Sequence, residues 1–367
     1  MRKIILTLSI IISAISHSIA QTNDIAILRT STEKIRVSVN GAISEEEIPL
    51  SEYQNDTLRI PIIVNPLNFT IYSDIDSIKT QIPINTEFTF RIQKKDMYPF
   101  VLIIRNGIEI EQINFDSINK NTDLHFAYES GLNNSYLEKL KANYPIDSIA
   151  STAKNDLEKV KAIASWVHGL WEHDGYNTPK QNDALYILNE VKAGQRFRCV
   201  EYGIVTTACL NAIGLPSRTL SLKTKNAEST PSGAGHVVME VFLKDMNKWI
   251  MVDPQWDAIP WSKGKPLNAV EFQKAITDKC DIEILTNNKE LNKYQYEAWI
   301  YSYLYYFSYK FDNRENIPKD KRITINDKSE LMLVPKGAKK PTIFQRKFPI
   351  DYCLYTNSIL DFYRSPI

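Results

Sequence analysis

Short stretches of alternating apolar and polar residues fill the chain from residue 21 to about residue 116. The stretches that predict strands are 35–39, 58–64, 69–72, 88–92 and 101–104. Asn-Gly pairs at 40–41 and 106–107 predict tight turns, the second of them leading into a further strand at 108–110. About seven short strands in so few residues predict a β-sandwich. We expect residues 21–118 to form this domain, which either packs on the rest of the chain or binds substrate or a cell-surface glycan.

Beyond residue 119 the apolar residues change to helical spacing. A connecting segment, 119–150, contains one short helix around 136–142. Asn155 and Glu158 have the spacing of a helix start, and apolar residues follow at intervals of three and four. A second helix is predicted over 183–193, with Gly194 as its end. A third begins at Cys199 and stops at Gly214.

After these helices, the residue pattern predicts an antiparallel hairpin. Residues 236–243 are apolar and β-branched, 245–247 supply a turn, and 248–253 return. His236 then begins one strand and Asp253 ends the next, so the two side chains lie at the same end of the hairpin.

These elements carry three residues with complementary chemistry. Cys199 lies in the first turn of its helix, where free backbone N–H groups and the helix dipole favour a thiolate. His236 is a candidate general base and Asp253 a candidate for orienting its ring. Cys209 falls on the buried stripe of the same helix and is expected to be a core residue. A Cys, His, Asp order alone arises by chance in many chains of this length, so the prediction depends on the placement.

Cys199, His236 and Asp253 lie in or next to four spaced stretches: 197–202 (FRCVEY), 214–218 (GLPSR), 234–241 (AGHVVMEV) and 248–253 (KWIMVD). In this order the stretches resemble the core of the transglutaminase-like superfamily, including the peptide:N-glycanases. The resemblance covers roughly residues 155–256 and implies a papain-like fold in which Cys199 is the nucleophile, His236 the base and Asp253 its partner. Many members have an aromatic residue two positions after the histidine, where this chain has Val238.

We therefore expect an α+β protein with four regions after a leader. They are a β-sandwich-like domain (21–118), a connecting segment (119–150), a transglutaminase-like catalytic domain (151–285) and an aromatic-rich, β-rich extension (286–367). Strand propensity predicts sheet across 294–311, with an aromatic face that is either core or a sugar-stacking surface, and a further strand at 331–334.

The expected function is cleavage or transfer of an amide or peptide bond through a thioester, with hydrolysis favoured over cross-linking. The substrate would be a protein, peptide or glycopeptide. The alternative is a catalytically inactive binding module at the cell surface, in which the papain-like core is only a scaffold. Three further residues are candidates for the oxyanion hole or the substrate cleft: Gln195, Trp256 and Trp261. No spacing of ligands indicates a metal, and no cofactor is expected.

The first residues and the overall charge bear on location. Met1-Arg2-Lys3, a short apolar run and Ser18-Ile19-Ala20 predict a signal peptide spanning 1–20 and an exported protein without stable membrane insertion, periplasmic or extracellular if bacterial. With 44 Lys and Arg against 43 Asp and Glu, the charge gives no support for nucleic-acid binding. Cys280 and Cys353 either pair or are buried thiols.

Overall fold

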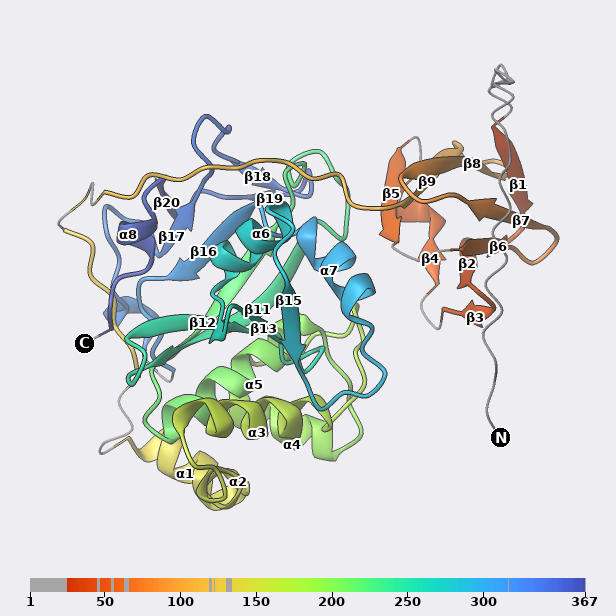
Figure 1. Ribbon diagram of the computed structural model, residues 1–367. Helices are drawn as coiled ribbons and strands as arrows, with labels where there is room; N and C mark the ends of the chain where they lie inside the picture. Colours follow the sequence, from red (N-terminus) through yellow and green to blue (C-terminus); the bar gives the residue numbers. More distant parts are fainter. Residues whose placement is uncertain are drawn as a thin grey trace, which may run out of the picture.

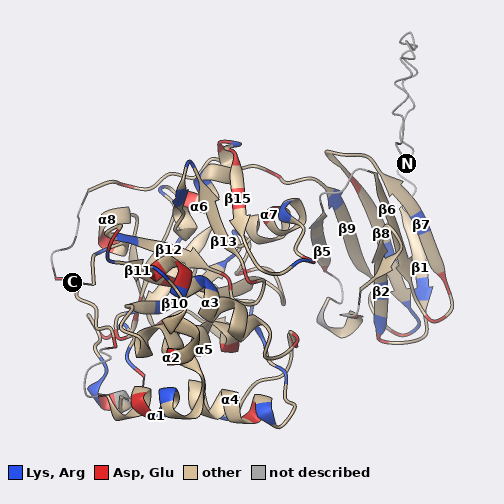
Figure 2. Cartoon of the chain, turned by 60° about the horizontal axis from the view of Figure 1, so that its bottom comes forward, with Lys and Arg blue, Asp and Glu red and all other residues tan. Residues whose placement is uncertain are grey.

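A computed structural model describes residues 25–44, 47–53, 56–62, 66–118, 121, 123–129, 134–315 and 317–366. The predicted leader, 1–20, lies outside these residues. The described chain has an all-β part and a larger α+β part, each with its own hydrophobic core (Figure 1). Lys and Arg are interspersed with Asp and Glu over both parts (Figure 2). In the described ranges, no helix combines the length and the apolar character needed to cross a bilayer.

The all-β part is a sandwich, as the sequence predicts. One sheet has the order β1-β8-β9-β5 and the other β3-β2-β6-β7, with β4 paired to β2. Alternate residues of facing strands, such as Phe69 and Leu102, are fully buried between the sheets. The strands are β1 (Ala26–Thr30), β2 (Lys34–Val39), β3 (Ala42–Ile43), β4 (Ile48–Pro49), β5 (Thr57–Ile62), β6 (Leu67–Tyr72), β7 (Ser77–Ile82), β8 (Thr86–Lys94) and β9 (Phe100–Asn106).

One strand expected in this part is wrong. Residues 108–110 form no strand, because at Gly107 the chain leaves the sheet instead of turning back. Gly107 has φ +138°, and its N–H donates to the carbonyl of Ile62 at the end of β5. A side chain there would also lie 3.1 Å from Asn85, so only glycine suits this exit.

The α+β part is built on a six-stranded sheet of order β12-β11-β10-β16-β17-β20. The helices α1 to α5 pack against one face, and α6 and α7 lie on the other (Figure 1). The strands are β10 (Ser217–Lys223), β11 (Gly235–Leu243), β12 (Lys248–Val252), β16 (Tyr306–Lys310), β17 (Glu330–Leu333) and β20 (Cys353–Thr356). The helices are α1 (Ser135–Asn143), α2 (Ile146–Ser151), α3 (Asp156–His168), α4 (Ala184–Lys192), α5 (Cys199–Ala212), α6 (Ala269–Thr277), α7 (Lys293–Tyr301) and α8 (Ile359–Phe362).

The predicted helices of this part are confirmed, together with their starts. Asn155 caps α3 by accepting the N–H of Glu158, and Asp183 caps α4 by accepting that of Tyr186. The central helix, α5, is buried on most of its circumference, which explains why its apolar residues are not confined to one stripe. Cys209 in that helix is fully buried, and burial raises the pKa of its thiol.

The sheet predicted across the aromatic stretch 294–311 is wrong for its first half. Residues 293–301 form α7, and only 306–310 form a strand. The side chain of Asn292 accepts the N–H groups of Tyr294 and Gln295 and so starts the helix. The strand predicted at 331–334 is confirmed as β17, and it pairs with β16 in the main sheet. The extension therefore contributes three strands to the same sheet as β10, β11 and β12.

The remaining elements are small. A three-stranded sheet joins β14 (Lys265–Pro266), β13 (Ile259–Ser262) and β15 (Ile282–Leu285), and β18 (Ile343–Phe344) pairs with β19 (Phe348–Pro349). Cys280 and Cys353 are both free thiols. They pack in different hydrophobic clusters, where Cys353 is buried and Cys280 is partly exposed.

The residues ahead of position 151 also pack into the core of the α+β part. Leu137 and Leu140 of α1, with Ile146 of α2, are at most 1% exposed in the cluster around α5. Phe115 and Phe126 contact rings in β16 and just after it. Among the described residues of the connecting segment, α1, α2 and Phe126 thus pack into the α+β part.

This packing gives a prediction for truncated chains. A fragment 108–367 should fold cooperatively, whereas 150–367 should be unstable or insoluble. Each buried leucine or isoleucine contributes about 1.5–3 kcal/mol, so losing the three in α1 and α2 removes much of a typical stability of about 5–15 kcal/mol. Circular dichroism and urea unfolding of the two fragments measure the difference. Equal midpoints would show that α1 and the preceding segment are dispensable.

Candidate active site

Cys199 is the first residue of α5, as predicted, and is partly exposed. The preceding residue, Arg198, is the N-cap, and its backbone N–H donates to the carboxylate of Glu201 at 3.1 Å. The Arg198 guanidinium also pairs with that carboxylate at 2.8 Å. Glu201 is fully buried, so this pairing compensates a negative charge that would otherwise oppose a thiolate at Cys199.

A glycine one turn further along brings the helix close to the histidine-bearing strand. A Cβ placed on Gly203 would lie 3.2 Å from a methyl group of Val237 and 3.5 Å from the carbonyl of Val238. Helix α5 therefore packs directly on β11, immediately after His236. Without this close approach the start of the helix would lie further from the histidine.

His236 and Asp253 form a buried hydrogen-bonded pair. Strands β11 and β12 are antiparallel, His236 is the second residue of the first, and Asp253 follows the second directly. His236 Nε2 lies 2.9 Å from Asp253 Oδ2, and the two side chains are 3% and 0% exposed. The hairpin therefore brings the two residues together as the sequence analysis expects.

The surroundings of His236 favour its charged form. Burial by itself lowers the pKa of the imidazole, but the charge and hydrogen bond of Asp253, with a hydrogen bond to the Cys199 sulfur, outweigh burial and raise it to about 10. At neutral pH the ring is thus an imidazolium that faces a carboxylate on one side and a sulfur on the other. An imidazolium beside a cysteine sulfur is an arrangement that favours ionisation of the sulfur.

A second donor to Asp253 comes from a residue that the sequence analysis missed. The hydroxyl of Tyr296 in α7 lies 3.1 Å from Asp253 Oδ2, the same oxygen that His236 contacts. The ring of Tyr296 is 2% exposed and packs near Trp256 and Phe272. The available signal was the helical spacing of Tyr296, Trp299 and Tyr303, which strand propensity obscured.

Aromatic rings from α7 and the turn after it also contact His236. The ring of Trp299 meets the imidazole edge-on at 4.8 Å between centroids, and Tyr303 lies at 5.9 Å. Val238, two positions after the histidine, is fully buried in the core on the α6 and α7 side of the sheet. The aromatic surroundings of the imidazole therefore come from the C-terminal extension and not from position 238.

The three cleft candidates lie in different surroundings. Trp256 packs against Trp299 at 5.3 Å, so it belongs to the aromatic cluster next to His236. Gln195 is an exposed residue after α4, and its side-chain oxygen accepts from Asn177. Trp261 is in β13, in the small three-stranded sheet. The structure thus brings Trp256 to the histidine and places Trp261 in a separate sheet.

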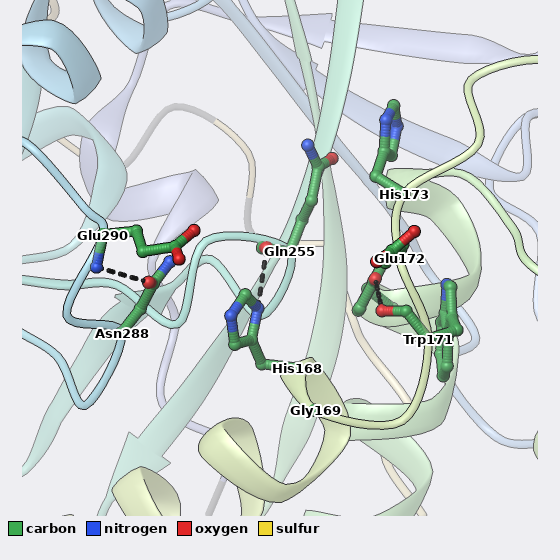
Figure 3. Close-up of a pocket in the computed structure, with 9 residues that line it drawn as sticks. His168, Gly169, Trp171, Glu172, His173, Gln255, Asn288 and Glu290 are labelled. Carbon is green, nitrogen blue, oxygen red and sulfur yellow. Dashed lines mark hydrogen bonds between the residues drawn. The ribbon is translucent and has the colours of Figure 1, made fainter. Parts of the chain in front are cut away.

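A cavity of about 420 Å³ is lined by residues close in sequence to Cys199 and Asp253, although those two residues and His236 are not among its lining residues (Figure 3). Tyr202, one turn after Cys199 in α5, and Gln255, two residues after Asp253, both line it. Its other lining residues are mostly polar: His168, Gly169, Trp171, Glu172, His173, Asn288 and Glu290. The Nδ1 atom of His168 is hydrogen-bonded to the Gln255 carbonyl, which fixes one wall. In the described part of the chain, no three His, Cys, Asp or Glu side chains are grouped so that they could hold a metal ion.

The all-β part approaches the segment that leads into His236. The hydroxyl of Tyr53 lies 2.7 Å from that of Ser232, four residues before the histidine. Asp56 in the same region forms an ion pair with Arg346. The loop 228–235 is therefore in contact with both the all-β part and the C-terminal extension.

Comparisons with known proteins address the family. Residues 146–254 match the family model of the transglutaminase-like superfamily. No curated protein matches the chain. Among solved structures, a proposed cysteine protease from Cytophaga hutchinsonii is 13% identical, with 49% of this chain and 62% of that one covered and a TM-score of 0.28. Red sea bream transglutaminase is 9% identical, with 69% and 55% covered and a TM-score of 0.26.

The periplasmic domain of TgpA from Pseudomonas aeruginosa is 13% identical, with 62% of this chain and 89% of that domain covered and a TM-score of 0.26. The chain spans about 62% of the Cytophaga protein and 55% of the fish transglutaminase, and all three scores are low. The family assignment accordingly rests on the model match, which spans Cys199, His236 and Asp253. Residues 146–254 of this chain are thus similar to the transglutaminase-like superfamily.

Proposed function

We propose that this protein is an exported cysteine enzyme that cleaves or transfers an amide bond through a thioester. The observation that carries the proposal is the buried His236–Asp253 pair, with Cys199 at a helix N-terminus on its other side. Cys199 is the nucleophile, His236 moves the proton, and Asp253 holds the imidazole in the reactive orientation.

The reaction proceeds in two balanced steps. The Cys199 sulfur attacks the amide carbonyl, and the free backbone N–H groups of the first turn of α5 are the proposed donors to the oxyanion. His236 gives its proton to the leaving amine as the C–N bond breaks, which leaves a thioester and a neutral imidazole. Water then attacks the thioester while His236 takes its proton, and the acid product leaves as the thiolate returns.

The substrate class is a protein, peptide or glycopeptide, and we propose hydrolysis over cross-linking. The polar cavity next to Tyr202 and Gln255 is the place where a substrate side chain near the reacting carbonyl would lie. Carboxylates, imidazoles and amides in its wall favour a polar side chain over an aliphatic one.

A thiol-directed activity-based probe tests the nucleophile. The secreted protein is incubated with the probe, digested and analysed by mass spectrometry, beside Cys199→Ser and Cys280→Ser variants. We expect one adduct, on Cys199, that is lost in the first variant and kept in the second. An unlabelled Cys199 would support the alternative, a catalytically inactive binding module.

Export makes a separate prediction. The short apolar core and small residues before Gln21 are typical of a cleaved leader, so the secreted protein should begin at Gln21. N-terminal sequencing or intact mass of protein from the medium or periplasm measures this. Recovery of Met1 in a membrane fraction would contradict it.

A further inference from the structure

The Asp253 carboxylate has an unusual distribution of partners. It is fully buried, and its Oδ2 atom receives both side-chain donors, His236 and Tyr296. Its Oδ1 atom is also buried and has no hydrogen-bond partner among the described residues. A buried carboxylate with so few donors is sensitive to each of them, because the low-dielectric surroundings offer no water in compensation.

Tyr296 is built to keep its hydroxyl at this position. It lies in α7, beyond residues 146–254, and its ring is held between α6 and the loop after Asp253. Burial, followed by the charge of Asp253, raises its pKa well above 10, so the hydroxyl keeps its proton. An ionised carboxylate can only accept, and the hydrogen bond therefore runs from Tyr296 to Asp253.

Two donors on one oxygen compete for the same electron density. The Tyr296 hydroxyl takes up part of the negative charge and so limits how strongly Asp253 attracts the proton on His236 Nε2. The same helix carries Trp299, whose ring lies against the imidazole. Helix α7 thus contacts both members of the pair. The other titratable groups that face His236 are Cys199 from α5 and Tyr303 from the turn after α7.

We propose that Tyr296 is a positioning residue that fixes Asp253 and moderates its hold on His236. The inference rests on the proposed function and extends it. Residues 146–254 supply Cys199, His236 and Asp253, and the C-terminal extension adds the hydrogen bond from Tyr296 to Asp253. Tyr296 touches neither substrate nor the reacting atoms, and it acts through Asp253 alone.

The test is the NMR resonance of the proton on His236 Nε2, which reports the strength of the bond to Asp253 without any substrate. The full-length mature protein carries Tyr296→Phe, which removes only the hydroxyl. With one competitor gone, the bond from His236 shortens, and the resonance should move downfield. Incorporation of 3-fluorotyrosine at position 296 keeps the hydroxyl and makes it a stronger donor, so the shift should be upfield and should not depend on how well the phenylalanine variant folds.

A matched control lies on the same helix. Tyr301→Phe also removes a hydroxyl from a buried ring. That hydroxyl forms hydrogen bonds with Thr277 and with the backbone of Glu111, and neither of these residues belongs to the His236–Asp253 pair. It should leave the His236 resonance in place. An unmoved resonance in both position-296 proteins, or an equal shift in Tyr301→Phe, would overturn the proposal.

The outcome is separable from that of the proposed function. Probe labelling of Cys199 decides whether the cysteine is a nucleophile, whereas the resonance decides whether Tyr296 acts on the His–Asp pair. Opposite shifts with an unreactive Cys199 would keep the positioning role and remove the enzyme.

Discussion

Replacing His236 with alanine should slow alkylation of Cys199 by iodoacetamide at about pH 6 at least tenfold. An ordinary protein thiol has a pKa of about 8.5 and is only about 0.3% thiolate at that pH. In the parent protein the pKa of His236 is raised to about 10 by Asp253 and the sulfur against the effect of burial, and we propose that the resulting imidazolium beside Cys199 favours the reactive, negatively charged sulfur. Mass spectrometry of the modified peptide at timed intervals gives the rate.

Two variants calibrate this result. Asp253→Asn should slow the reaction less than His236→Ala, because the imidazole and the helix N-terminus both remain. His168→Ala removes a histidine that lines the neighbouring cavity, and it should leave the rate unchanged. If His236→Ala reacts as fast as the parent, Cys199 and His236 form no ion pair.

The same raised pKa makes stability depend on pH. The ordinary value for histidine is about 6.5, so folding takes up a proton at His236 between that pH and about 10. The stabilisation is complete below pH of about 6.5 and is lost as the pH rises through the folded value. Formation of the proposed thiolate releases the proton that an ordinary thiol keeps up to about pH 8.5, so the two proton changes offset each other below that pH. The free energy of unfolding should therefore fall more steeply with pH for the parent than for His236→Ala between about pH 8.5 and 10.

The second large effect concerns stability rather than chemistry. Replacing Glu240 with alanine should lower the free energy of unfolding by about 3–5 kcal/mol, because it leaves a buried guanidinium without its counter-ion. Arg218 and Glu240 are both 0% exposed and 2.6 Å apart. The guanidinium lies over the rings of Tyr309 and Trp249, at 3.6 Å and 4.2 Å from their centroids.

Both residues of this ion pair also form hydrogen bonds with the C-terminal end of the chain. Arg218 contacts the carbonyl of Phe362 in α8, and Tyr363 donates its hydroxyl to Glu240 at 2.9 Å. Loss of the carboxylate therefore releases a contact with the extension as well as a charge. Urea unfolding followed by circular dichroism measures the change.

A surface ion pair of similar length is the control. Lys274 of α6 and Asp278, which directly follows the helix, are 2.7 Å apart, but their side chains are 71% and 36% exposed. Asp278→Ala should change stability by no more than about 0.5 kcal/mol, since water screens exposed pairs. A comparably small loss for Glu240→Ala would show that Arg218 gains water or another partner in the variant.

Local patterns predicted much of the site. The start of α5 at Cys199 follows from helical spacing and the Gly214 stop, and the hairpin that joins His236 to Asp253 follows from two apolar strands around a short turn. Each of these features depends on neighbours within about twenty residues, which is the range where sequence patterns are informative.

The contribution of distant segments could not be predicted in the same way. Tyr296 reaches Asp253 across 43 positions, and its segment has the composition of a strand although Asn292 starts a helix there. Leu137 and Leu140 fit the pattern of a short helix, but nothing near them in the sequence indicates that they are buried in the cluster around α5. Tertiary packing decided these positions, and no local signal states which distant surface will bury a given side chain.

The most direct test of the central claim is the alkylation rate of each cysteine in the parent protein at about pH 6. Cys280 is the internal standard, because it is partly exposed like Cys199 and packs against the hydrophobic cluster around α6 and α7. The account predicts that Cys199 is modified at least about tenfold faster than Cys280, while Cys209 and Cys353 remain unmodified because burial raises their pKa and blocks access. Equal rates at Cys199 and Cys280 would contradict the claim that Cys199 is an activated nucleophile.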